Sequence, residues 1–273
     1  MKIFSLAIFA LSLAFVRPIF AQEIVLKDGQ IIETKGVRRS EDMVMSAVEV
    51  GQTRGEVGYQ VSTIAKINFS EPPQLATTAA LLAQGEPGKA LAEIEPVVKF
   101  YAPFRDIAGN FWAQAALLKV SALAGLQLDK EAANLSDEIR KHSTDPETAR
   151  AAQLQVVGRL VRKEDYAKAL ALCDDVISKS AQPSVLAEAW VKKGDAFLAE
   201  RNWSDAEIAY LHVPVFYDGE KFWMPPALLG SARAFRGLAD LDRARKSFND
   251  LAAQYPKSAE AEIARSELEK MPK

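Results

Sequence analysis

The residue types that most often carry out chemistry are few in this chain and lie far apart. There are two histidines, His142 and His212, and a single cysteine, Cys173. The histidines have no companion ligands near them, so the spacing argues against a zinc site and against a Ser-His-Asp triad. One cysteine excludes an intrachain disulfide and a thiolate metal cluster. We therefore expect no metal, no cofactor and no enzymatic activity, and an enzyme, or the helical arm of one, is the least favoured alternative.

Two further patterns could suggest chemistry, and both are better explained as structure. Gly85-Glu-Pro-Gly-Lys89 would need a glycine at Ala83, Ser or Thr at Ala90 and a preceding strand to be a phosphate-binding loop, so we interpret it as a turn. The acidic pairs Asp174-Asp175 and Glu260/Glu262 are one or two residues apart on expected helices, where their carboxylates diverge instead of sharing a proton.

The strongest pattern is an alanine that recurs at steps of 42, 37, 37 and 38 residues. Four residues after each alanine comes a second position, which is apolar or aromatic in four of the five cases. The alanines are Ala90, Ala132, Ala169, Ala206 and Ala244, and the second positions are Ile94, Ser136, Cys173, Tyr210 and Phe248. A turn-like segment precedes each alanine. This period is typical of a stacked array of helix-turn-helix hairpins.

The two repeated positions have a clear physical role in such an array. Ala206 and Ala244 are expected where the two helices of a hairpin cross closely, and Tyr210 and Phe248 are expected to fill the gap between neighbouring hairpins. Cys173 occupies the same position as these aromatics. It is therefore interpreted as a small buried apolar residue, with a reactive thiol as the alternative.

The first 21 residues have the composition of a cleaved export signal. Lys2 precedes an apolar stretch from Ile3 to Val16, and Phe20-Ala21 then precedes the polar Gln22. The stretch is short for a membrane span, although an uncleaved anchor is the alternative. We expect a periplasmic or secreted protein, cleaved near Ala21, with no stable membrane insertion of the mature chain.

Residues 22–70 have the texture of a small β-domain. Short apolar runs at 23–27, 30–37, 43–48, 55–61 and 64–69 predict five strands, and Asp28-Gly29 predicts a tight turn. The pattern resembles an SH3-like or Sm-like barrel, closed or nearly closed, that could bind glycan or peptide. A linker at 71–76, which contains Pro72-Pro73, separates it from the helical region at 77–271.

The helical region resembles the tetratricopeptide repeat (TPR). Its pattern is met by Trp190, Gly194, Phe197, Ala206 and Tyr210, and the next unit offers Ala232, Phe235, Ala244, Phe248 and Pro256. The motif is sharp only from about residue 150. Tyr255-Pro256-Lys257-Ser258, with Ala261 and Ala264, is similar to the repeats of bacterial periplasmic proteins of the YbgF and BamD kind. The resemblance implies a right-handed solenoid of about five hairpins.

In a TPR array the first helix of each hairpin lines the concave groove. This resemblance places Val191, Asp195 and Leu198 in the groove, followed by Leu229, Arg233 and Arg236. The two arginines could bind a carboxylate of a peptide beside an apolar strip. A solvated or internally paired arginine face is the alternative.

The connection between the fourth and fifth hairpins carries four aromatic residues: Phe216, Tyr217, Phe222 and Trp223. They could form an exposed contact site, or they could cover the hairpin ends. We include them among the candidate partner-binding residues.

The fold class that follows is α+β multidomain, with a small N-terminal β-barrel and an all-α TPR-like solenoid. The net charge of −2 gives no indication of nucleic-acid binding. The expected function is that of a non-catalytic exported scaffold or adaptor for a protein or peptide partner in the cell envelope. A self-associating structural protein, held through the aromatic insert or the array ends, is the alternative.

Overall fold

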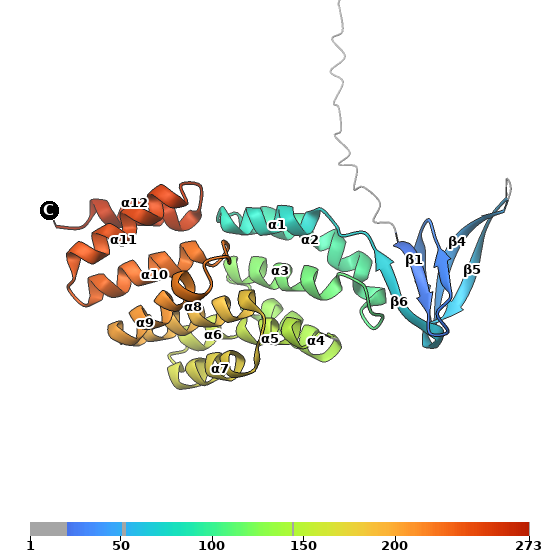
Figure 1. Ribbon diagram of the computed structural model, residues 1–273, viewed down its shortest axis with the longest axis horizontal. Coiled ribbons are helices and arrows are strands. Elements are labelled where there is room, and N and C mark those ends of the chain that lie inside the picture. Colours follow the sequence, from blue (N-terminus) through green and yellow to red (C-terminus); the bar gives the residue numbers. More distant parts are fainter. Residues whose placement is uncertain (1–20, 51–52, 144, 273) are drawn as a thin grey trace, which may run out of the picture. The chain divides into compact units, whose positions relative to one another are not determined.

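The computed structural model describes residues 21–50, 53–143 and 145–272 (Figure 1). The chain divides into two compact units, with the boundary between Ser70 and Glu71. The leader predicted for residues 1–21 lies outside the described residues except for Ala21, at which the first strand begins. None of the described helices is long and apolar enough to cross a bilayer.

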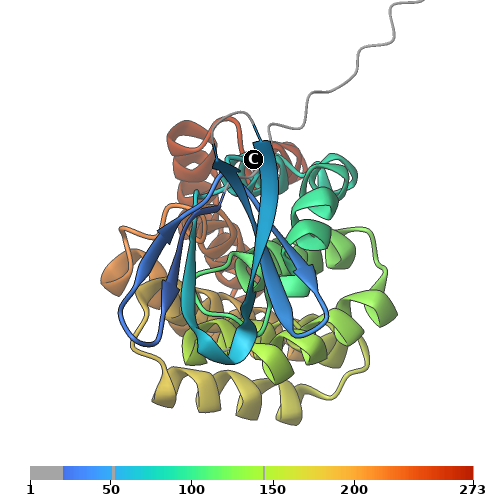
Figure 2. The same ribbon diagram turned by 90° about the vertical axis from the view of Figure 1, so that its right-hand side faces the viewer.

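The first unit consists of short strands, drawn as blue to cyan arrows in Figure 2. The strands are β1 Ala21–Leu26, β2 Ile31–Glu33, β3 Val37–Ser40, β4 Met43–Val50, β5 Thr53–Gln60 and β6 Ile64–Phe69, with a 3-10 turn, η1, at Val61–Thr63. The single strand predicted at 30–37 is divided into β2 and β3. A local turn causes the division, since the hydroxyl of Thr34 donates to the Gly36 carbonyl at 2.8 Å and accepts from the Gly36 amide at 3.2 Å.

The predicted closed barrel is wrong, because the described strands form two separate antiparallel sheets. One sheet has the order β2-β1-β6 and the other the order β3-β4-β5. Sequence-adjacent β2 and β3 belong to different sheets, and so do β5 and β6. The predicted strands are largely present, but the backbone hydrogen bonds between strands do not continue from one sheet into the other. Ile24, Val44 and Ile67 of the two sheets are fully buried.

The second unit is helical throughout. Its helices are α1 Gln74–Ala83, α2 Pro87–Tyr101, α3 Trp112–Gly125, α4 Asp129–His142, α5 Pro146–Leu154, α6 Val157–Arg162, α7 Tyr166–Lys179, α8 Pro183–Glu200, α9 Trp203–Phe216, α10 Met224–Gly237, α11 Leu241–Gln254 and α12 Ala259–Glu269, with a 3-10 turn, η2, at Ala102–Phe104. They pack in chain order as five hairpins: α1–α2, α3–α4, α5/α6–α7, α8–α9 and α10–α11, followed by α12 (Figure 1). The first helix of the third hairpin is broken between Leu154 and Val157.

The turn inside each hairpin has the same backbone conformation. One residue with a φ between 59° and 73° lies five positions before each repeat alanine, and these residues are Gly85, Gln127, Glu164, Arg201 and Ala239. The left-handed conformation ends the first helix and reverses the chain. The geometry is therefore regular even where the TPR motif is weak, and four of the five positions lack the glycine that this φ favours.

The repeat alanines and the positions four residues later are all buried, as the period predicts. The five alanines have exposed fractions of 0–7%, and the five second positions have exposed fractions of 0–1%. Cys173 is among them, which confirms its interpretation as a buried residue. Burial raises the pKa of its thiol to about 12, so it is not activated as a nucleophile.

Tyr210 shows how closely neighbouring hairpins pack. A Cβ added to Gly194 would lie 2.6 Å from the Tyr210 ring, and one added to Gly230 would lie 2.2 Å from it. The Tyr210 hydroxyl donates to the Asp195 carboxylate at 2.7 Å. The ring thus occupies space that two glycines leave open, and its polar end is satisfied.

Candidate functional site

Three pockets lie among the second, third and fourth hairpins. The α3–α5 pocket has a volume of about 70 Å³, the α5–α8 pocket about 280 Å³ and the α4–α6 pocket about 190 Å³. Gln114, Asp145 and Thr148 line both of the first two pockets, so these two are neighbours with a shared wall. The surface made by these pockets is the candidate site.

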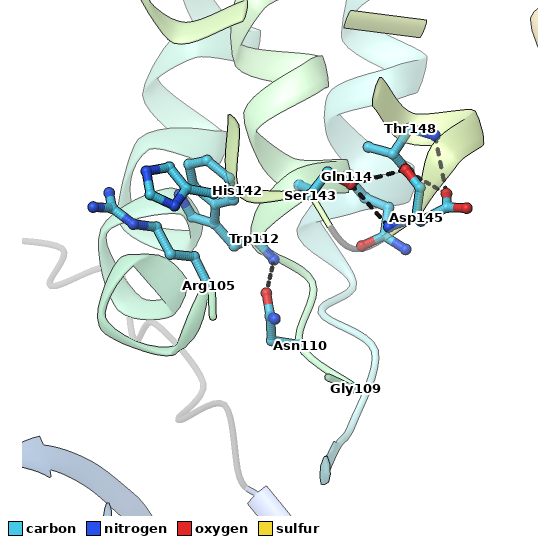
Figure 3. A pocket seen from close by; sticks show the side chains of 10 residues that line it. Arg105, Gly109, Asn110, Trp112, Gln114, His142, Ser143, Asp145 and Thr148 are labelled. Carbon is cyan, nitrogen blue, oxygen red and sulfur yellow. Dashed lines mark hydrogen bonds between the residues drawn. The ribbon is translucent and has the colours of Figure 1, made fainter. Parts of the chain in front are cut away.

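The α3–α5 pocket is built around Trp112, which is 2% exposed (Figure 3). The His142 ring meets its indole edge-on at 6.3 Å between centroids, and the Arg105 guanidinium lies 5.8 Å from the indole centroid. The Trp112 amide donates to the Asn110 side-chain oxygen at 2.7 Å. His142 is therefore a packing residue at the end of α4.

Asp145 begins α5 and borders both pockets. Its carboxylate accepts from the Thr148 amide at 3.0 Å, the Thr148 hydroxyl at 2.6 Å and the Glu147 amide at 3.3 Å. Partial burial alone would raise the pKa of Asp145, but these hydrogen bonds hold that pKa below its usual value. Asp145 is thus an ionised helix cap that fixes this wall of the site.

The α5–α8 pocket contains a buried carboxylate. Glu188 of α8 is 6% exposed, and burial raises the pKa of its carboxyl. Its Oε1 accepts from the Gln155 side-chain amide at 2.6 Å and lies 3.7 Å from Lys192 Nζ. Gln155 reaches Glu188 from the break between α5 and α6. The irregular helix therefore places a hydrogen-bond donor against this carboxylate.

The α4–α6 pocket has the opposite charge. Arg159, Arg162 and Lys192 line it, with Asp129 as the one acidic side chain. Arg162 pairs with Asp129 across the pocket. Because Lys192 and Glu188 are one turn apart on α8, an acidic and a basic pocket adjoin along the same helix.

The structure places the groove residues predicted on α8 and α10 in different surroundings. Asp195 is exposed and accepts from Tyr210, Leu198 is half-buried, and Leu229 is 5% exposed. Although the residue keeps exposed surface, partial desolvation of its carboxyl raises the pKa of Asp195, and the hydrogen bond from Tyr210 opposes that rise. Leu229 belongs to the core, so it is not available to a ligand in this conformation.

The predicted arginine pair contacts a carboxylate of the chain itself. Arg233 Nη2 lies 2.6 Å from Glu267 Oε1, and Arg236 Nη1 lies 2.8 Å from Glu267 Oε2. Glu267 is on α12, 34 residues beyond Arg233. The internally paired arrangement that the sequence left open is thus the one present, and it secures α12 to α10.

The aromatic insert divides into exposed and packed residues. Phe216 is 68% exposed and Phe222 is 42% exposed. Tyr217 and Trp223 are half-buried and pack against the core of the fourth hairpin. Trp223 also lines the α5–α8 pocket. The insert therefore has two exposed aromatic residues, as a contact site would need, and two aromatic residues that pack against the hairpins.

Glu188 and Gln155 were not singled out by sequence reasoning. A glutamate in an expected helix is normally solvated, and nothing near Glu188 in sequence marks it as buried. The signal available was that the third unit, around Leu160, Ala169 and Cys173, fits the repeat less well than the two units after it, and the break beside Gln155 lies in that unit. In the described part of the chain, no group of three or more His, Cys, Asp or Glu side chains is placed to hold a metal ion.

Residues 226–258 match the family model described as tetratricopeptide repeat. This segment covers α10, α11 and the turn that follows. No curated protein sequence matches the chain. The chain therefore contains a tetratricopeptide repeat within a helical, solenoid-like unit, and repeats of this kind typically serve in non-catalytic protein–protein interaction.

Proposed function

We propose that this protein is an exported scaffold of the cell envelope, and that its helical unit holds a protein or peptide partner on the surface formed by α3, α5, α6 and α8. The observation that carries the proposal is the pair of adjoining, oppositely charged pockets on that surface. Interfaces use such complementary charges to orient a partner and to exclude wrong ones.

Several sequence and structural features support this role. The matched repeat at 226–258 favours protein partners. The leader-like residues 1–21 and the similarity of the Tyr255–Ser258 segment to YbgF and BamD repeats favour an envelope location. The pockets are lined by residues of the second, third and fourth hairpins, so a partner held there would contact several repeats at once.

The proposal is tested by crosslinking in the native host followed by affinity capture of the mature protein. We expect one or a few envelope proteins to be captured with the wild type and to be lost with Ser184→Trp, which fills the α5–α8 pocket. Glu200→Trp, at the exposed far end of the same helix, is the matched control. Capture of no envelope component, together with recovery of the protein in the cytosolic fraction, would contradict the proposal.

A self-associating structural protein is a second candidate, because α9 exposes an apolar stripe. Ile208 is 54% exposed, Val215 is 64% exposed and Phe216 is 68% exposed. Residues 208 and 215 are two turns apart and share one helical face. Light scattering over a range of concentrations tests it: a mass that rises with concentration in the wild type but not in Val215→Ser/Phe216→Ser supports self-association.

A further inference from the structure

We propose that the α5–α8 pocket is a subsite for the side chain of an arginine or lysine of the partner, with Glu188 as its counter-charge and Trp223 as its wall. This inference rests on the proposed function and gives the chemistry of the partner. A single basic side chain is the occupant, because the pocket of about 280 Å³ is smaller than a typical drug-sized ligand site.

The polar lining of the pocket is acidic and carries no basic side chain. Asp145, Glu147 and Glu188 line it, with no lysine or arginine among its lining residues. The acidic character by itself is a weak argument, since carboxylates often gather on solvated surfaces. What matters is which of the three retains an oxygen for a ligand.

Two of the three carboxylates are already engaged. Asp145 caps α5 through the three hydrogen bonds given above. Glu147 Oε1 pairs with Arg150 at 2.6 Å and accepts from the Ala181 amide at 3.3 Å, and its Oε2 accepts from the Ser180 hydroxyl at 2.5 Å. Neither carboxylate is therefore available without breaking structure.

Glu188 differs from both. It is more than nine-tenths buried, and its two partners, Gln155 and Lys192, both approach Oε1. Within the described part of the chain, Oε2 has no hydrogen-bond partner. A carboxylate can accept several hydrogen bonds, so one oxygen of a buried acid is left for a donor from outside the chain. A cationic donor offsets the cost of burying the negative charge better than a neutral one.

The rest of the pocket suits the remainder of a long basic side chain. Leu117, Val185 and Trp223 also line the pocket and supply apolar and aromatic surface for the methylene stem of such a side chain. The wall and the counter-charge come from different hairpins, since Trp223 precedes α10 and Glu188 lies on α8. The same combination would hold a metal ion poorly, because only one free carboxylate oxygen is present.

The test uses capped pentapeptides Ac-Ala-Ala-X-Ala-Ala-NH₂, in which X is Arg, Lys, Leu or citrulline, the uncharged isostere of arginine. Binding to the purified protein is followed by the indole N–H signal of Trp223, which is identified by its loss in Trp223→Phe. We expect the Arg peptide to bind about tenfold more tightly than the citrulline peptide, and the Lys peptide to lie between them.

Two pocket variants and one control sharpen the test. Glu188→Gln should reduce the Arg-to-citrulline preference to within about twofold, while Glu200→Gln, the same change on the exposed end of α8, should leave it unchanged. Ser184→Lys, one turn before Glu188, should supply the cation internally and abolish binding of every peptide. It keeps the carboxylate, so the test stands even if Glu188→Gln does not fold.

Equal binding of the Arg and citrulline peptides, a preference retained in Glu188→Gln, or the absence of any Trp223 shift would each overturn the inference. These outcomes leave the scaffold function standing if the envelope partner is still captured. Conversely, the Arg preference without any captured partner would uphold the pocket and remove the support for the scaffold.

Discussion

The junction between the fourth and fifth hairpins and the junction between the second and third hairpins use the same repeat position with different side chains. At the first, Tyr210 fills the space that Gly194 and Gly230 leave open. At the second, the equivalent residue is Ser136, whose hydroxyl donates to the Ala132 carbonyl of its own helix at 2.8 Å. Both residues are at most 1% exposed, so both positions are internal although one side chain is far smaller.

The difference between the two junctions can be compared with where the pockets lie. The α4–α6 pocket includes Ala132, one turn from Ser136, and the other two pockets border α3 and α5. The fifth hairpin, which matches the repeat model, also has a pocket, of about 460 Å³, but this one is lined by the turn residues 238–242 and not by neighbouring hairpins.

Removing the aromatic ring at the tight junction should have the largest effect. We expect Tyr210→Ala to lower the free energy of unfolding by ~3–5 kcal/mol, because a fully buried ring is replaced by a cavity. Chemical denaturation followed by circular dichroism measures it. Tyr210→Phe, which keeps the ring and loses only the bond to Asp195, should cost much less.

Ser136→Ala is the matched change at the loose junction. It should alter the free energy of unfolding by less than about 1 kcal/mol, since it removes only a hydroxyl bonded within α4. A cost for Ser136→Ala equal to that of Tyr210→Ala would end the distinction between the two junctions.

Adding a methyl group at the tight junction should be the next largest perturbation. Gly230→Ala places a Cβ within 2.2 Å of the Tyr210 ring, and we expect a loss of ~1–3 kcal/mol from overpacking. The effect should shrink in a Tyr210→Leu background, because the clashing ring is gone. Additive costs in the double variant would show that the two residues do not share this space.

Substitutions at two of the turn residues should change the stability of the protein in opposite directions. Ala239→Gly should stabilise the protein by about 1 kcal/mol, because the native φ of 59° strains an alanine. Gly85→Ala, at a φ of 73°, should destabilise it by a similar or larger amount, because the new Cβ would also lie 3.0 Å from Ala259 at the start of α12. Thermal unfolding of both variants measures the difference, and shifts of the same sign would contradict equivalent turns.

The last prediction concerns the cap of α5 beside the pockets. Asp145→Ala should cost ~1 kcal/mol at neutral pH, because the Thr148 and Glu147 amides lose their acceptor. The pKa of Asp145 is below its unfolded value of 3.8, so its contribution is present above that pH and is lost as the pH falls below it. The variant should therefore lose less stability on acidification from pH 5 to pH 2 than the wild type does.

A structural feature could be predicted from the sequence when residues close together in the chain determine it. Features that depend on contacts between distant residues could not. The repeat alanines and the positions four residues later could be predicted to be buried, because the same close packing of two helices recurs in each hairpin. The barrel prediction failed because the strand patterns of β2 and β3 do not state which sheet each strand joins. Arg233 and Arg236 could be assigned to a face of α10, but their pairing with Glu267 depends on the docking of α12.

The pockets were the hardest part to foresee. Trp223 was selected for its aromatic character, yet its role beside Glu188 depends on the meeting of two hairpins. Gln155 contacts Glu188 only because the first helix of the third hairpin breaks at that point. Neither fact follows from helical periodicity.

Site-specific photocrosslinking in the native host tests the central claim most directly. A photoreactive residue is placed at Ser184, which lines the α5–α8 pocket, and in a second strain at Glu200, at the opposite end of α8. The account predicts a crosslinked partner from position 184 and little or none from position 200. Equal crosslinking from both positions, or crosslinking from position 200 alone, would contradict it.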